Sequence, residues 1–223
     1  MTVDNMYNGT DELFLRMISC SDITEQSSGR IESFVTDEIF EIWRKYSSGL
    51  EMQIGELWVQ KLDLTKALHA GISLFEFHKL SPAVRAVMEG LFDIRSCSHR
   101  LKEEVDWPAN RQSIPHGLLH VNSIFVIEGE RHKQAVGRTL KLLVNFHVAK
   151  YLTCLFVRAY SDNSARRTKL DWGELPRTVS SKDAVSQIIR GLYRCGLRPI
   201  GGKPQVMYLP RAIQSVWMSG IAA

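Results

Sequence analysis

The chain has 223 residues, of which 44% are hydrophobic and 23% are charged. These values are close to the globular average, so they exclude disordered, collagen-like and low-complexity proteins. No apolar stretch approaches the roughly 18 residues needed to cross a bilayer, and residues 1–30 lack the pattern of a classical secretory signal. The four cysteines are widely spaced with no CxxC pair, which predicts neither a disulfide framework nor a zinc site.

Charge is unevenly distributed, although the net charge is only +4. Residues 1–60 hold eleven acidic and four basic side chains, residues 61–128 hold eight of each, and residues 129–223 hold five acidic and sixteen basic ones. A basic region of this kind attracts phosphate-rich polymers or anionic lipid. An acidic N-terminal region can in turn bind the basic region of a neighbouring molecule. The sequence therefore predicts an anionic partner and self-association.

Residues 1–30 show no sustained hydrophobic period, which predicts a flexible N-terminal arm with one short docking segment at residues 13–15. The remaining residues, 31–223, are expected to form a single domain. Thr36 has the features of a helix N-cap because acidic residues follow it in the first turn. The apolar residues up to Trp43 favour a short amphipathic helix there.

Two further elements are predicted before the middle of the chain. Residues 50–64 alternate imperfectly between apolar and polar side chains, which indicates a long strand with a bulge around Gly55. Ser81 and Pro82 are typical of the N-cap and the first position of a helix. The apolar residues that follow at three-and-four spacing extend this helix to Phe92.

The second half of the chain predicts an antiparallel β-meander. A polar segment with two prolines, residues 98–117, is expected to be a long surface loop. Residues 119–129, 138–148 and 151–160 are rich in β-forming side chains and are separated by short turns. This pattern favours three consecutive antiparallel strands.

A polar loop, a helix and a terminal strand are predicted after the meander. The loop covers residues 161–177, and Ser180 or Ser181 caps a helix whose apolar face extends to Leu192. Residues 196–210 then predict a turn and an edge strand. The whole pattern indicates an α+β fold in which an antiparallel β-meander sheet is backed by two or three helices, with the mobile arm at the N-terminus.

Three patterns are similar to chemical sites but are better explained as structure. His116 and His120 have a metal-ligand spacing, but the proline and glycine beside them disfavour a helix, so we expect a loop-to-strand junction. Residues 97–99 (Cys-Ser-His) lack a second ligand pair and a glycine-flanked elbow. Residues 201–205 (GGKPQ) lack the remaining features of a phosphate-binding loop and predict a hairpin turn. No catalytic residue, metal or cofactor is therefore expected.

Two clusters of basic residues are the strongest candidates for a functional surface. Both lie in or beside predicted loops that flank strands, so both can neutralise phosphates without reading bases. Ordinary solvated cations are the alternative explanation. The phenylalanines of neighbouring strands are better placed for the core, which disfavours sequence-specific RNA recognition. The first cluster contains Arg131, Lys133, Arg138 and Lys141, and the second contains Arg166, Arg167 and Lys169.

The segment LTCLFVRAYSDNS is followed by a polar loop with a tryptophan, then by KDAVSQIIRGLYRCGL and PQVMYL. With the elements before it, this order resembles the C-terminal half of rhabdovirus matrix proteins over residues 50–210, with local detail over residues 150–210. The chain lacks a PPxY-type segment, and its arm is acidic where the animal-virus members carry a lysine-rich one. The resemblance therefore does not imply that the arm recruits the protein to a membrane or that the chain recruits budding machinery.

The resemblance implies a non-enzymatic structural protein that self-associates and bridges a ribonucleoprotein, or RNA, and an anionic membrane surface. It implies a location in the virion or in the host cell cytoplasm or nucleus, with no small-molecule substrate. The alternative is a sequence-independent RNA-binding regulator, such as a pathogen effector or a silencing suppressor. A third class, an enzyme that uses Cys97 or the histidines, needs a concave site that the sequence does not indicate.

Overall fold

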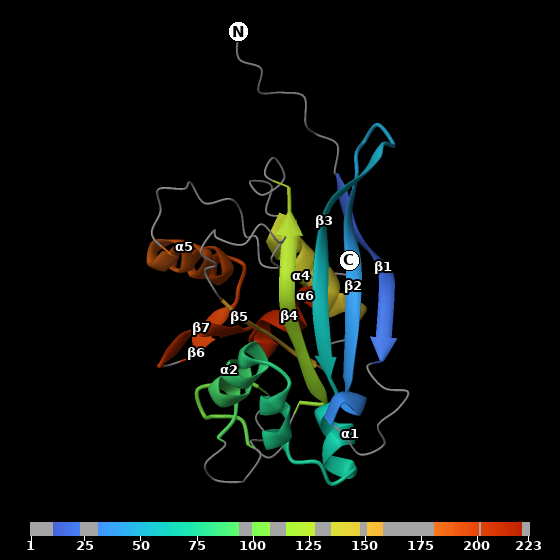
Figure 1. Cartoon of the computed structure of the whole chain (residues 1–223). Coiled ribbons are helices and arrows are strands. Elements are labelled where there is room, and N and C mark those ends of the chain that lie inside the picture. The colour runs from blue at the N-terminus through green and yellow to red at the C-terminus, as the bar shows by residue number, and fades with distance from the viewer. Residues whose placement is uncertain are drawn as a thin grey trace.

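A computed structural model describes eight segments of the chain: residues 11–22, 31–93, 100–107, 115–127, 135–147, 151–157, 181–200 and 202–219. Together they form one seven-stranded sheet with helices on both faces (Figure 1). The strand order is β1-β2-β3-β4-β5-β7-β6, and all neighbours are antiparallel except β4 and β5, which are parallel. The predicted α+β class is confirmed.

The strands and helices alternate along the chain mainly in its second half. The strands are β1 (Glu12–Asp22), β2 (Val35–Lys45), β3 (Glu51–Leu62), β4 (Gly117–Val126), β5 (Tyr151–Phe156), β6 (Arg198–Ile200) and β7 (Lys203–Tyr208). The α-helices are α1 (Leu64–His69), α2 (Pro82–Leu91), α4 (Ala135–Phe146), α5 (Ser181–Arg194) and α6 (Arg211–Ser219), and the 3₁₀ helices are η1 (Ile31–Phe34) and η2 (Leu74–Lys79).

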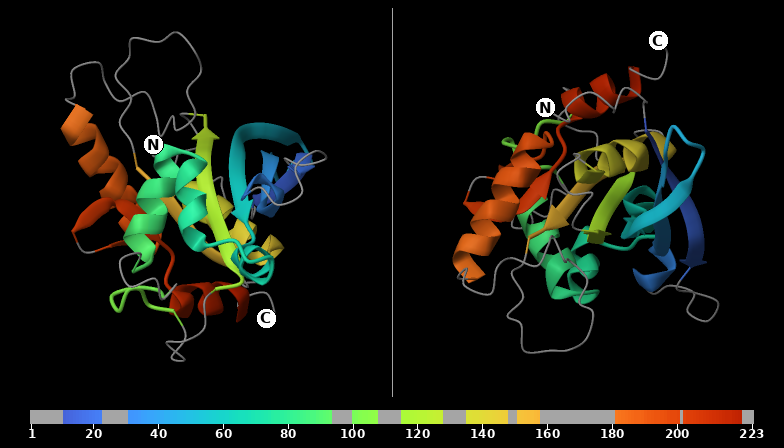
Figure 2. Two further views of the ribbon diagram at one scale, coloured as in Figure 1. Left: turned by 60° about the horizontal axis from the view of Figure 1, so that its bottom comes forward. Right: turned by 90° about the horizontal axis from the view of Figure 1, so that it is seen from above.

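The sheet separates two hydrophobic cores. On one face, called here the α4 face, residues such as Leu57 and Val121 pack with Leu143 of α4 and with apolar side chains of α5 and α6. On the opposite face, called the α2 face, Leu62 and Leu118 pack with apolar side chains of α1, η2 and α2. Figure 2 shows these two groups of helices on opposite sides of the sheet.

Several elements lie where the sequence predicts them. β3 carries the expected bulge, because its pairing with β2 shifts register beside Gly55. A Cβ at that position would lie only 2.1 Å from the Phe125 carbonyl oxygen, so glycine is required there. Ser81 caps α2 by accepting a hydrogen bond from the Val84 amide at 3.1 Å. β4, β5, α5 and the turn between β6 and β7, where Gly202 has a φ of 75°, are also confirmed.

The predicted helix from Thr36 to Trp43 is wrong, because this segment belongs to β2. Glu38, Phe40 and Ile42 alternate with less buried residues, so their period is two rather than 3.6. Strands on both sides satisfy the main chain of β2, and this tertiary pairing outweighs the capping pattern that favours a helix.

The prediction of a flexible arm is wrong for Glu12–Asp22, because this segment forms the edge strand β1 and pairs with β2 along its length. Leu13 is buried against the α4 face, so the expected docking at residues 13–15 occurs, but within the sheet. Residues 1–10 and 23–30, the rest of the predicted arm, lie outside the described residues.

The predicted meander is also wrong at its centre. Residues 138–148 were expected to form a strand, but Ala135–Phe146 is the helix α4. Its buried residues Thr139, Leu140, Leu143 and Val144 follow the three-and-four spacing of a helix that packs on one side. The chain therefore crosses from β4 through α4 to the parallel strand β5, as parallel neighbours require.

The C-terminal part differs from the prediction in two details. β7 lies inside the sheet between β5 and β6, so the edge strand is β6 rather than the expected terminal strand. A further helix, α6, follows where no element was predicted, and its Ile213 packs on the α4 face. The predicted loop over residues 161–177 lies outside the described residues.

Leu91→Ala should destabilise the protein by about 2 to 5 kcal/mol, because it leaves a cavity in a close-packed core. Leu91 is fully buried at the end of α2. Leu50→Ala removes the same atoms from a side chain that is 63% exposed, so it should cost less than about 0.5 kcal/mol. Urea unfolding of the two variants measures both effects, and equal losses would show that α2 does not pack on the sheet as described.

Candidate functional site

The sheet opens into a fork between its two parallel strands. β4 and β5 are paired only from Gly117 with Tyr151 to His120 with Cys154. β4 continues to Val126 and β5 to Phe156, but beyond the last pair the two strands diverge (Figure 1). An unpaired strand edge can accept an extended ligand through main-chain hydrogen bonds. The fork is therefore the first candidate for a functional site.

Two features of the strands explain why they separate. In β4, Val121 and Ser123 pair with successive residues of β3, so Asn122 is an extra residue that forms a bulge. A bulge bends its strand and increases the local twist. On the other side, β5 continues to follow β7, and the Val157 amide donates to the Gln205 carbonyl at 2.8 Å. β4 and β5 thus keep different neighbours.

Main-chain groups of β4 point into the fork. The Ile127 amide donates to the Ile54 carbonyl at 2.9 Å, so the main chain of Ile127 faces β3. Because successive residues of a strand alternate in direction, the amide and carbonyl of Ile124 face the opposite edge, toward β5. An extended ligand in the fork would meet hydrogen-bonding groups of this edge.

The N-terminus of α4 follows the carboxyl end of β4 in the chain. The first amides of an α-helix have no partner within the helix and carry a partial positive charge. No acidic residue lies in the first turn of α4 to neutralise it. Residues 128–134, which join β4 to α4, lie outside the described residues.

The structure places two of the seven predicted basic residues. Arg138 is exposed on α4, and its guanidinium donates to the Asp11 carbonyl at 2.9 Å. Lys141 is half-buried on the same helix, one turn further on. The first cluster therefore belongs to a helix and the link before it rather than to a hairpin turn. The other five residues of the two clusters lie outside the described residues: Arg131, Lys133, Arg166, Arg167 and Lys169.

The last residue pair before the fork contributes a histidine and a cysteine. His120 is 1% exposed, and its Nδ1 lies 3.4 Å from Gln60 Oε1. Burial raises the pKa of the Cys154 thiol far above its ordinary value, so this side chain stays protonated and is not a nucleophile. His116 and His120 stand at a loop-to-strand junction, as predicted. Within the described ranges, no group of histidine, cysteine or acidic side chains is arranged to hold a metal ion.

A second polar group lies on the α4 face, where Glu38 of β2 is level with Val121 at the start of the fork. Glu38 is 2% exposed, and its two carboxylate oxygens lie 2.9 Å from Lys61 Nζ and 2.7 Å from His147 Nε2. Burial alone would raise the pKa of Glu38, but the bonds from His147 and Lys61 outweigh it and hold that pKa below its ordinary value. The sequence alone does not reveal this group, because only the register of β2 with β3 and the end of α4 bring the three residues together.

Comparison of the chain with protein-family models, with curated proteins and with solved structures finds no match. Among the described residues, no helix combines the length and the apolar character that a membrane span requires.

Glu38→Gln should remove a pH-dependent part of the stability. The pKa of Glu38 in the folded protein lies below 4.5, so its ionised form stabilises the fold above pH 4.5, and this contribution is lost as the pH falls through the lower folded-state value. We expect a loss of about 3 kcal/mol near neutral pH, because the substitution leaves the Lys61 ammonium without its counter-charge. Urea unfolding from neutral to acid pH measures the difference between parent and variant.

The matched control is Glu104→Gln, at an exposed position outside the sheet. It should change the free energy of unfolding by less than about 0.5 kcal/mol at both neutral and acid pH. If the deficit of Glu38→Gln stayed constant from neutral pH down to below the range of carboxylate titration, the ion pair would not be the source of the stability.

Proposed function

We propose that the fork binds an extended ligand that carries amide groups along its chain and phosphates at one end. Coenzyme A and phosphopantetheine represent this chemical class. The observation that carries the proposal is the divergence of β4 and β5 after only four residue pairs, at the carboxyl ends of the strands. Extended chains bind to strand edges through main-chain hydrogen bonds, and the amide and carbonyl of Ile124 face the fork.

The phosphate end of the ligand would lie at the N-terminus of α4. Free amides and the helix dipole favour phosphate at such a terminus. Arg131 and Lys133 precede the helix by only a few residues in the chain, so they can add charge-assisted contacts. The first basic cluster would then bind one discrete phosphate group rather than a polymer.

A ligand of this class carries acyl groups as thioesters at the end of its extended chain. In the corresponding reaction a nucleophilic acceptor attacks the thioester carbonyl, the carbon–sulfur bond breaks, and the thiol leaves with the proton that the acceptor loses. This reaction makes the protein an acyltransferase under the proposal. The proposal departs from the sequence-based expectation of a non-enzymatic protein without cofactor or small-molecule substrate.

Calorimetric titration of the whole chain with coenzyme A and with its two halves tests the proposal. Adenosine 3′,5′-bisphosphate represents the phosphate end, and pantetheine represents the extended chain. Linking two binding parts makes the second contact intramolecular, so coenzyme A should bind at least about tenfold more tightly than either half. Binding of the bisphosphate with the same affinity as coenzyme A would show that the fork holds no extended chain.

Arg131→Ala with Lys133→Ala should weaken the binding of coenzyme A and of the bisphosphate by about tenfold or more, and leave pantetheine unaffected. The matched control is Arg166→Ala with Arg167→Ala and Lys169→Ala, which removes the second basic cluster and should not change coenzyme A binding. The same two variants also test the matrix and RNA-binding functions that the sequence predicts. Those functions stay predictions. A phosphate polymer as the true ligand would bind with a steep salt dependence that both variants reduce.

A further inference from the structure

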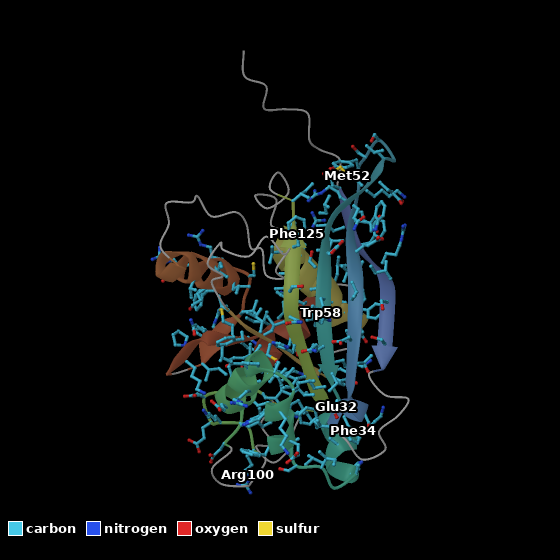
Figure 3. The ribbon with its side chains drawn as sticks, in the orientation of Figure 1. Glu32, Phe34, Met52, Trp58, Arg100 and Phe125 are labelled. Atoms are coloured by element: carbon cyan, nitrogen blue, oxygen red, sulfur yellow. The ribbon has the colours of Figure 1, made fainter. Side chains whose placement is uncertain are left out.

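Part of the α2 face of the sheet is covered by no helix among the described residues, and this part is called here the acidic face. It lies on β2, β3 and β4 above the helices that cover the rest of this face, where Trp58 and Phe125 are labelled in Figure 3. Phe125 is 39% exposed and Glu56 is also exposed. The acidic face consists of Asp37, Glu41, Trp43, Glu56, Trp58 and Phe125.

The register of the strands concentrates negative charge at the centre of the acidic face. Glu41 of β2 lies directly opposite Glu56 of β3, and Glu56 lies opposite Phe125 of β4. Like charges directly opposite each other destabilise a strand pair. Arg16 of β1 lies opposite Glu41 on its other side and relieves part of this repulsion. A cationic group from a second molecule, placed over Glu56, would relieve the rest.

The aromatic rings of the acidic face are held by hydrogen bonds, and one of them already accepts a guanidinium. The Trp43 indole donates to Glu41 at 2.8 Å, and the Trp58 indole donates to Asp37 at 3.2 Å. The guanidinium of Arg16 already lies over the Trp43 ring, 4.5 Å from its centroid. This surface therefore binds an arginine within its own chain by cation–π contact, which indicates the side chain that it suits.

A complementary surface, called here the basic end of α5, lies on the other side of the molecule. It consists of Arg190, Tyr193 and Arg194 of α5 with Arg198 of β6. Tyr193 is 52% exposed, and the guanidinium of Arg198 lies 4.3 Å from the centre of its ring. In the described part of the chain, no carboxylate forms an ion pair with these three arginines.

The two surfaces of one molecule cannot reach each other. Both views of Figure 2 place α5 and β1–β3 on opposite sides, with β4, β5 and β7 between them. A second copy of the chain can bring its basic end of α5 to the acidic face. The residues involved, tryptophan, tyrosine and arginine, are those that contribute most of the binding energy in protein interfaces.

We propose that the chain self-associates head to tail, with the basic end of α5 of one copy bound to the acidic face of the next. Because the two surfaces differ, the contact is heterologous, and repetition builds rings or open filaments. This inference stands independently of the proposed function, since it uses neither the fork nor the N-terminus of α4.

Charge reversal on each surface tests the proposal by sedimentation at low and high salt. The variant with Glu41→Lys and Glu56→Lys, and the variant with Arg190→Glu and Arg194→Glu, should each lower the self-association constant by at least about tenfold. A mixture of the two variants should associate again, because each retains one native surface and their reversed surfaces also attract. This recovery also demonstrates that both variants are folded.

The matched control is Glu103→Lys with Glu104→Lys, which makes the same charge change at two exposed residues outside the acidic face. It should associate like the parent, and high salt should weaken the parent and the variant mixture alike. A parent that stays monomeric at every concentration would overturn the proposal. So would a reversed variant that associates as strongly as the parent, or a mixture that associates no better than its components.

Discussion

The short parallel pairing of β4 with β5 is the constraint on which the rest of this structure depends. Parallel neighbours need a long crossover, and α4 provides it by packing across one face of the sheet. The pairing ends at His120 and Cys154 because β4 bends at its bulge while β5 follows β7. One contact therefore joins the two halves of the sheet and also opens the fork between them, beside the positive end of the crossover helix.

The position of this crossover also decides how the two faces of the sheet are used. α4, α5 and α6 all pack on the same face, so α1, η2 and α2 have to cover the other one. Those elements are short and pack around Leu62 and Leu118, so among the described residues no helix covers Trp58 and Phe125. The acidic face is thus a consequence of this unequal distribution of helices.

Adjacent residues of β2 show how strongly the sheet separates chemical environments. Asp37 faces the open side, where its carboxylate accepts a hydrogen bond from the Trp58 indole. Glu38 faces the α4 side, where it is buried between Lys61 and His147 and stays ionised because both supply a compensating partner. A one-residue shift in the register of β2 would exchange these two carboxylates, so the buried ion pair helps to specify the register.

Local chemistry in the sequence by itself determined α2, the bulge at Gly55 and the turn at Gly202, because capping side chains and glycines act on their immediate neighbours. It also determined the charge of the first basic cluster. Only the tertiary structure decided that residues 36–43 form a strand and that residues 138–146 form a helix, since short apolar runs satisfy either period until neighbouring elements supply hydrogen bonds and a packing surface. The same holds for the fork, because the divergence of two strands depends on partners that are distant in the chain.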